Sequence, residues 1–154
     1  MKLAAAAQMR ELDRRAIEER KIPSIDLMER AAAEVAQAVL DLLPDKPSNC
    51  RAAVFCGSGN NGGDGVACAR LLMERGGCHV RAFFVGDRAK MTPDERAIED
   101  RLTAAGGCLE DFSIDLTDRE TAEATFTFEQ QKISAWLSTC DCMVDALFGI
   151  GLTR

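Results

Sequence analysis

Residues 57–65, with the sequence GSGNNGGDG, hold the residues of this chain that are best suited to chemistry. Five of these nine residues are glycines, and the stretch follows residues 51–56, an apolar run typical of a buried strand. Glycine lets the backbone turn sharply and approach a ligand, and a helix that begins after such a turn offers unpaired N–H groups to a phosphate. Residues 57–62 match the dinucleotide-binding pattern G-x-G-x-x-G, whereas no G-K-S/T follows that would indicate a P-loop.

The polar residues of this stretch are unusual for a dinucleotide-binding loop. Asn60, Asn61 and Asp64 place two amides and a carboxylate where small or apolar residues are usual. A carboxylate beside a pyrophosphate is unfavourable unless a cation offsets its charge or the side chain is engaged elsewhere. One interpretation is that Asp64 caps the following helix while the asparagines occupy left-handed turn positions. The other is that these oxygens hold a small cation or a sugar hydroxyl.

Asp145, in the run VDALFGIG, is the second candidate. A charge in an otherwise apolar strand is costly to bury unless it is paired or bound to a metal, although Asp145 could also cap the next turn. If residues 142–148 form a parallel strand, Asp145 and the glycine-rich loop both lie at carboxyl ends of strands, where α/β sheets bind ligands. Gly149 and Gly151 would form a second turn there, so we expect both loops to face one crevice.

The elements that must position these residues follow from the hydrophobic pattern. Two N-terminal helices are expected, over residues 9–20 and from a cap at Ser24 to about residue 43, with a break at the Ile22-Pro23 pair. The remaining expected elements are strands at 51–56, 79–85, 108–114 and 142–148 and helices at 64–75, 92–105 (with a capping box from Thr92 to Glu95) and 117–137 (one or two helices). This alternation predicts an α/β fold, a three-layer Rossmann-like parallel sheet with two extra N-terminal helices.

Composition narrows the classes of function. The 154 residues are 47% apolar and 29% charged, which is typical of one globular domain. The net charge of −6 argues against nucleic-acid and anionic-membrane partners. No apolar run approaches the roughly 20 residues of a membrane span, and the first residues lack the apolar core of a signal peptide, so we expect a cytoplasmic protein.

The seven cysteines do not form a recognisable framework. Their number is odd, no two form a C-x-x-C pair, and His79 is the single histidine, which makes a zinc site improbable. We expect reduced thiols that act as small hydrophobic side chains. Cys140 and Cys142 form the one pair with a redox alternative, although alternation along a strand would point both side chains to one face as core residues.

Three segments together resemble the NAD(P)H-hydrate epimerase family, the YjeF N-terminal domain. They are GSGNNGGDG, the N-terminal stretch MRELDRRAIEERKIPSIDLMERAA, and VDALFGIGLTR. The resemblance implies a Rossmann-type fold and a potassium-dependent isomerase that interconverts the R and S forms of hydrated NADH and NADPH (NADHX and NADPHX). It also implies a homodimer and cooperation with an ADP- or ATP-dependent dehydratase, either fused or separate.

The same resemblance implies roles for particular residues. Asn61 and Asp145 are expected to bind potassium, whose preference for hard oxygen ligands suits an amide and a carboxylate. The residues expected to contact the hydrated dinucleotide, or a related adenine nucleotide, are Asn60, Asn61, Gly62, Gly63, Asp64, Gly149, Ile150, Gly151, Leu152, Thr153 and Arg154.

Two departures from the family pattern affect these expectations. Ile150 stands where family members commonly have threonine, so a hydroxyl contact is lost there. A later family segment resembling V-D-I-P-S-G, which supplies the expected catalytic Asp and a further potassium ligand, is absent from this sequence. Residues 1–154 are therefore expected to form a domain that is incomplete at its C-terminus and inactive alone.

Two alternatives remain open at this stage. One is a nicotinamide-dependent oxidoreductase in which Asp87 grips the ribose, disfavoured by Asp64 and by the absence of tyrosine. The other is a non-catalytic nucleotide-binding or protein-interaction module. Binding without epimerisation would favour the module.

Overall fold

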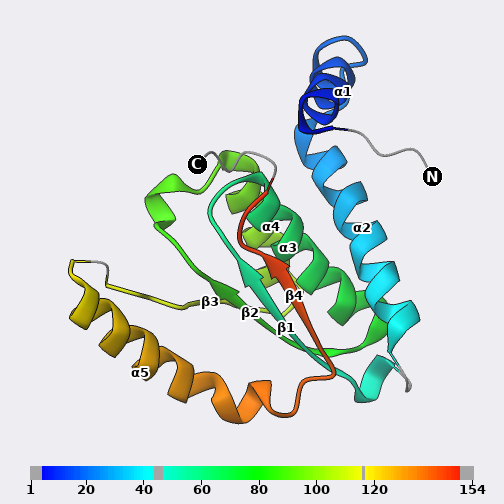
Figure 1. Cartoon of the computed structure of the whole chain (residues 1–154). Helices are drawn as coiled ribbons and strands as arrows, with labels where there is room; N and C mark the ends of the chain where they lie inside the picture. The colour runs from blue at the N-terminus through cyan, green and yellow to red at the C-terminus, as the bar shows by residue number, and fades with distance from the viewer. Residues whose placement is uncertain (1–4, 44–46, 116, 150–154) are drawn as a thin grey trace.

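A computed structural model of the chain describes residues 5–43, 47–115 and 117–149. Within these residues, four parallel strands form one sheet (Figure 1). The strands are β1 (Arg51–Cys56), β2 (His79–Phe84), β3 (Leu109–Asp111) and β4 (Cys142–Ala146), in the order β3-β2-β1-β4. The order reverses direction between β1 and β4, which is the position where open α/β sheets bind ligands.

Helices cover both faces of this sheet, as Figure 1 shows. Helices α3 and α4 lie on one face with α2 packed against α3, and α5 crosses the other face. The α-helices are α1 (Ala6–Glu18), α2 (Ser24–Leu42), α3 (Asn60–Leu71), α4 (Pro93–Ala104) and α5 (Arg119–Leu137), with short turns η1 (Pro47–Asn49), η2 (Leu72–Gly76) and η3 (Arg88–Lys90). The predicted three-layer α/β fold is therefore confirmed.

The two layers of helices enclose two separate cores. Alternation along a strand sends successive side chains to opposite faces, so Val54 points toward α3 and Ala53 toward α5. The core under α3 and α4 is the larger one and includes Val54, Val66, Phe84, Ile98 and Leu102. The core under α5 is built around Ala53, Phe83, Phe112 and Ile133. Helix α1, in contrast, has no buried residue.

Three predicted helix starts are wrong in detail. Helix α3 begins at Asn60 after Gly59, whose φ of +111° ends the preceding turn, so Asp64 lies inside the helix and does not cap it. Ser24 is the first residue of α2, preceded by Pro23, and its hydroxyl donates to Asp94 on α4. Helix α5 begins at Arg119 with Asp118 as its cap, two residues later than the predicted start at residue 117.

The cysteines behave as expected in most respects. All seven are reduced cysteines, and four of them are buried, namely Cys50, Cys56, Cys68 and Cys78. Burial raises the pKa of Cys68 to about 12, which keeps that thiol protonated and unreactive. Cys108 is exposed, so it does not follow the prediction of a buried small side chain. Cys140 and Cys142 are half-buried.

No helix in the described part of the chain has both the length and the apolar character that a membrane span requires.

Candidate functional site

A cleft of about 760 Å³ opens at the carboxyl ends of β1 and β4. This volume lies within the range of about 300–1,000 Å³ that is usual for small-molecule sites. Its lining comes from α1 (Met9, Arg10, Asp13), from the glycine-rich loop and the start of α3 (Ser58, Gly59, Asn60, Asn61, Asp64), from Thr92 before α4, and from the segment after β4 (Leu147, Phe148, Gly149). The structure thus brings the two glycine-containing loops to one crevice.

The glycines of α3 pack the helix tightly instead of lining the cleft. A Cβ at Gly62 would lie 1.7 Å from the Gly57 carbonyl oxygen, and one at Gly63 would lie 2.5 Å from the Met28 sulfur. A Cβ at Gly65 would lie 2.5 Å from the Cβ of Ala146 on β4. Gly62 and Gly63 are therefore buried beneath the cleft, and they let α3 approach the loop, the sheet and α2.

The start of α3 leaves several polar groups open toward the cleft. No side chain caps the helix, and Gly63 N–H is the first to bond back along the chain, to the Gly59 carbonyl at 3.0 Å. The N–H groups of residues 60–62 have no partner among the described residues, and neither do the side chains of Asn60 and Asn61. Unpaired N–H groups at a helix N-terminus, with the positive end of its dipole, suit an anion such as phosphate.

Asp64 has the electrostatic environment of a functional carboxyl. Its side chain is half-buried one turn into α3, and it makes no hydrogen bond within the described part of the chain. Burial, with a smaller contribution from the nearby Asp13 on α1, raises the pKa of Asp64 to about 6. Asp64 therefore changes its protonation near neutral pH, which the sequence-based interpretation as a helix cap did not anticipate.

Asp145 is not the buried charge that the sequence predicted. It is exposed, and its Oδ1 accepts a hydrogen bond from Leu147 N–H at 2.9 Å, as in the alternative of a turn cap. Strand order explains this exposure, because β4 lies at an edge of the described sheet. Asp145 pairs with Phe55 of β1, so its side chain points to the face of the sheet on which α5 lies. The core under α5 contains residues of β1 and β2, and the β4 side of that face is left open. Its neighbour on that face, Met143, is 65% exposed.

The two residues expected to bind potassium occupy different surroundings. Asn61 lines the cleft and lies beside Gly149, where an added Cβ would be 3.0 Å from the Asn61 Cβ. Asp145 does not line the cleft. Amide and carboxylate oxygens both suit a hard cation, and of the two side chains Asn61 is the one that the cleft exposes to a ligand. The expected contacts Ile150, Gly151, Leu152, Thr153 and Arg154 lie outside the described residues.

Several lining residues were not found from the sequence. Arg10 and Asp13 belong to the amphipathic helix α1, and the pattern of its polar face does not indicate that it lines a binding site. Thr92 was recognised only as a helix cap, a role that it does have because its Oγ1 accepts from Glu95 N–H at 3.1 Å. Asp87, the ribose ligand of the oxidoreductase alternative, accepts from Ala89 N–H at 2.9 Å and does not line the cleft.

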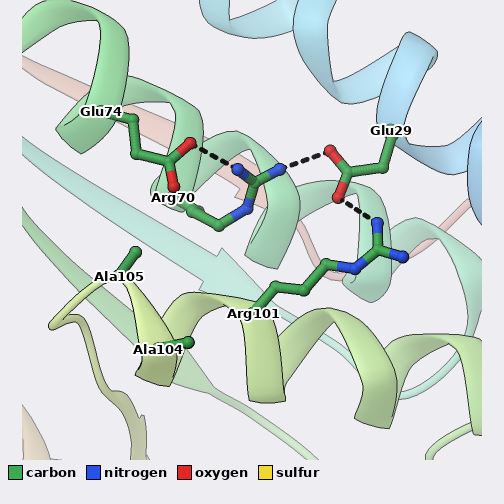
Figure 2. Close-up of a pocket in the computed structure, with 6 residues that line it drawn as sticks. All are labelled: Glu29, Arg70, Glu74, Arg101, Ala104 and Ala105. Carbon is green, nitrogen blue, oxygen red and sulfur yellow. Dashed lines mark hydrogen bonds and ion pairs between the residues drawn. The ribbon is translucent and has the colours of Figure 1, made fainter.

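A second cavity, of about 470 Å³, lies between α2, α3 and α4 (Figure 2). Glu29 on α2 accepts from Arg70 on α3 and from Arg101 on α4, the latter at 2.8 Å. Arg70 also pairs with Glu74, as Figure 2 shows. Two arginines and two glutamates neutralise one another here, so we assign these residues a role in holding the three helices together.

Comparisons with known proteins agree with this geometry. A family model for the YjeF-related protein N-terminus matches residues 24–154. The chain is 37% identical over 150 residues to an NAD(P)H-hydrate epimerase from Rhodobacter capsulatus, covering 95% of this chain and 61% of that protein. It is also 37% identical over 154 residues to a bifunctional NAD(P)H-hydrate repair enzyme, Nnr, from Thermofilum pendens, covering 100% of this chain and 26% of that protein.

A solved structure shares the fold. The crystal structure of the yeast protein YNL200c superposes with a TM-score of 0.72 at 23% sequence identity, covering 100% of this chain and 59% of that one. The chain spans about three fifths or less of the length of these relatives. Because the family match extends over most of the sequence, the resemblance seen in the motifs is confirmed, and the chain belongs to the family of YjeF-related protein N-terminal domains.

Proposed function

We propose that this chain provides the nucleotide-binding part of an isomerase that interconverts the R and S forms of hydrated NADH and NADPH. The observation that carries the proposal is the uncapped start of α3, whose unpaired N–H groups and polar side chains line the cleft. The identity of 37% to an NAD(P)H-hydrate epimerase supports the choice of substrate.

The charges of the cleft favour one orientation of the dinucleotide. Its pyrophosphate would lie at the start of α3, where N–H groups and the helix dipole favour negative charge. Asp13 and Asp64 would face groups that donate hydrogen bonds, such as ribose hydroxyls or the carboxamide, because a carboxylate beside a phosphate is repelled. Gly149, with the residues that follow it in the sequence, would contact the second side of the ligand.

We also propose that the 154-residue chain binds the nucleotide without completing catalysis. Proton transfer at the ring hydrate needs an acid or base within hydrogen-bonding reach, an effect worth about 10²–10⁴ in rate. The carboxyls that line the cleft are Asp13 and Asp64, which we assign to substrate binding. The test is to follow R-to-S interconversion by chromatography above its spontaneous rate. Full activity of residues 1–154 would contradict this assignment and make Asp64, with its pKa of about 6, the acid or base.

Potassium binding by Asn61 and Asp145 is a further proposal, supported by the oxygen chemistry of the two side chains and by the open amide of Asn61. An ion that binds only the native state raises stability by RT ln(1 + [L]/Kd). The melting temperature should therefore be higher in potassium than in sodium at equal ionic strength. Asn61→Ala and Asp145→Ala should each reduce the difference, whereas equal melting temperatures in both salts for the wild type would leave Asp145 as a turn cap.

The partners and the location of the chain are proposed from its membership of the family. We propose a homodimer, to be tested by light scattering after size exclusion, and a cytoplasmic location, to be tested by cell fractionation. Cooperation with an ADP- or ATP-dependent dehydratase is supported by the bifunctional repair enzymes among the relatives.

A calorimetric titration with NADPHX tests the binding step directly. Saturable binding that Asp64→Asn weakens and Glu74→Gln leaves unchanged would support the cleft, because Glu74 belongs to the second cavity. A wild-type protein that is folded and shows no binding would overturn the proposal. Binding without epimerisation, by a protein that also carries the family segment resembling V-D-I-P-S-G, would favour a non-catalytic module.

A further inference from the structure

Glu95, in the first turn of α4, is a buried carboxyl that lies directly behind the glycine-rich loop. Its side chain is fully buried, at 0% exposure. It belongs to a capping box in which Oε2 accepts from Thr92 N–H at 3.3 Å while Thr92 Oγ1 accepts from Glu95 N–H. Such a box needs only these two bonds and forms as well on an exposed helix, so capping does not explain why the carboxyl is buried.

The same carboxyl also reaches the loop of the cleft. Glu95 Oε2 accepts from Gly59 N–H at 2.8 Å, a contact between residues 36 positions apart. Gly59 is the residue that precedes α3 and lines the cleft, with a φ of +111°. Thr92 lines the cleft as well. One carboxylate oxygen therefore connects the first turn of α4 to the residue that sets where α3 begins.

The other oxygen of Glu95 is buried against the same loop. Oε1 has no hydrogen-bond partner among the described residues, and a Cβ added at Gly62 would lie 2.7 Å from it. Burial raises the pKa of Glu95, while the hydrogen bonds from Gly59 and Thr92 act in the opposite direction. A buried carboxyl with one unpaired oxygen is costly, so its place under the loop calls for a role there.

We infer that Glu95 is a positioning residue of the nucleotide site, which holds Gly59 so that the N–H groups at the start of α3 open toward the cleft. The nature of the ligand rests on the proposed function, whereas the hold on the loop does not. Without the Glu95 acceptor, Gly59 N–H is left unpaired, and the turn before α3 loses its hydrogen bond to the first turn of α4.

The test compares three variants on α4. Glu95→Ala removes the acceptor, Glu95→Gln keeps a carbonyl oxygen for Gly59 N–H, and Glu99→Ala removes a carboxylate one turn later that pairs with Arg88 and does not line the cleft. Two quantities are measured: the dissociation constant for NADPHX and the hydrogen-exchange rate of the Gly59 amide.

Glu95→Ala should weaken NADPHX binding by about tenfold or more, the loss that corresponds to one hydrogen bond, and should accelerate exchange at Gly59. Glu95→Gln should stay within about threefold of the wild type in both quantities. Glu99→Ala should leave both unchanged even if it lowers the melting temperature. Slow Gly59 exchange or wild-type affinity in a folded Glu95→Ala protein would overturn the inference.

Two further outcomes, an unfolded Glu95→Ala protein and a wild type that does not bind NADPHX, also test the role of Glu95. If Glu95→Ala does not fold, Glu95→Asp replaces it, because a side chain shorter by one methylene draws the acceptor oxygen back from Gly59 N–H. Fast Gly59 exchange in that variant supports the inference, and slow exchange overturns it. If the wild type binds no NADPHX, the proposed function fails, and Gly59 exchange in the variants decides the role of Glu95 alone.

Discussion

The cleft and the cavity between α2, α3 and α4 differ in what their charged groups already contact. In the cavity between α2, α3 and α4, each arginine and glutamate is paired within the fold (Figure 2). In the cleft at the carboxyl ends of β1 and β4, the side chains of Asn60, Asn61 and Asp64 make no hydrogen bond with the described residues. The comparison shows that charge alone does not mark a binding site, because paired charges stabilise the fold and unpaired polar groups remain available to a ligand.

The largest expected effect comes from filling the space beneath the cleft. Gly62→Val places a side chain against the Gly57 carbonyl, where even a Cβ would be only 1.7 Å away. We expect a loss of about 3 kcal/mol in the free energy of unfolding and the loss of NADPHX binding. Gly106→Ala is the control, because nothing lies within 4 Å of its added Cβ although its φ is +84°. That variant should lose only about 1 kcal/mol, measured by denaturant titration. Equal losses in the two variants would contradict the packing role of Gly62.

A smaller effect is expected from the paired cavity. Glu29→Gln removes the negative charge that Arg70 and Arg101 share. The free energy of unfolding should fall by about 1–2 kcal/mol, less than for a fully buried ion pair because Arg101 is half-exposed. NADPHX affinity should not change. A calorimetric titration that shows weaker binding in a folded Glu29→Gln protein would break the distinction between the two cavities.

The sequence predicts those features of the fold and the site that depend on neighbouring residues better than those that depend on contacts between distant segments. Residues 51–56 form a strand as predicted because the apolar run is local, and the capping box predicts α4 for the same reason. The pattern predicts the start of α3 at residue 64, four residues too late, because glycines have poor helix propensity and packing against α2 and β4 is what stabilises this turn. The exposure of Asp145 depends on strand order, and the approach of Asp13 and Glu95 to the loop depends on contacts between distant segments.

The smallest expected effect is on the pH dependence of stability. Asp64 has a pKa of about 6 in the folded protein against an ordinary value of 3.8. Between about pH 4 and 6 the native state therefore holds more protons than the unfolded state, so the free energy of unfolding falls as pH rises and stays reduced above pH 6. Asp64→Asn should remove this decline and stabilise the protein at pH 7 by on the order of 1 kcal/mol, a value limited by the partial exposure of the side chain. Denaturant titrations at pH 4 and pH 7 measure it, and a decline that persists in Asp64→Asn would assign it to another group.

The most direct test of the central claim is a titration of ¹⁵N-labelled protein with NADPHX, followed by amide chemical shifts. The cleft predicts saturable shifts at Gly59, Asn60, Asn61 and Gly149, with the amides of Glu29, Arg70 and Arg101 unchanged. Shifts confined to the second cavity, or no saturable shift at the start of α3, would contradict it.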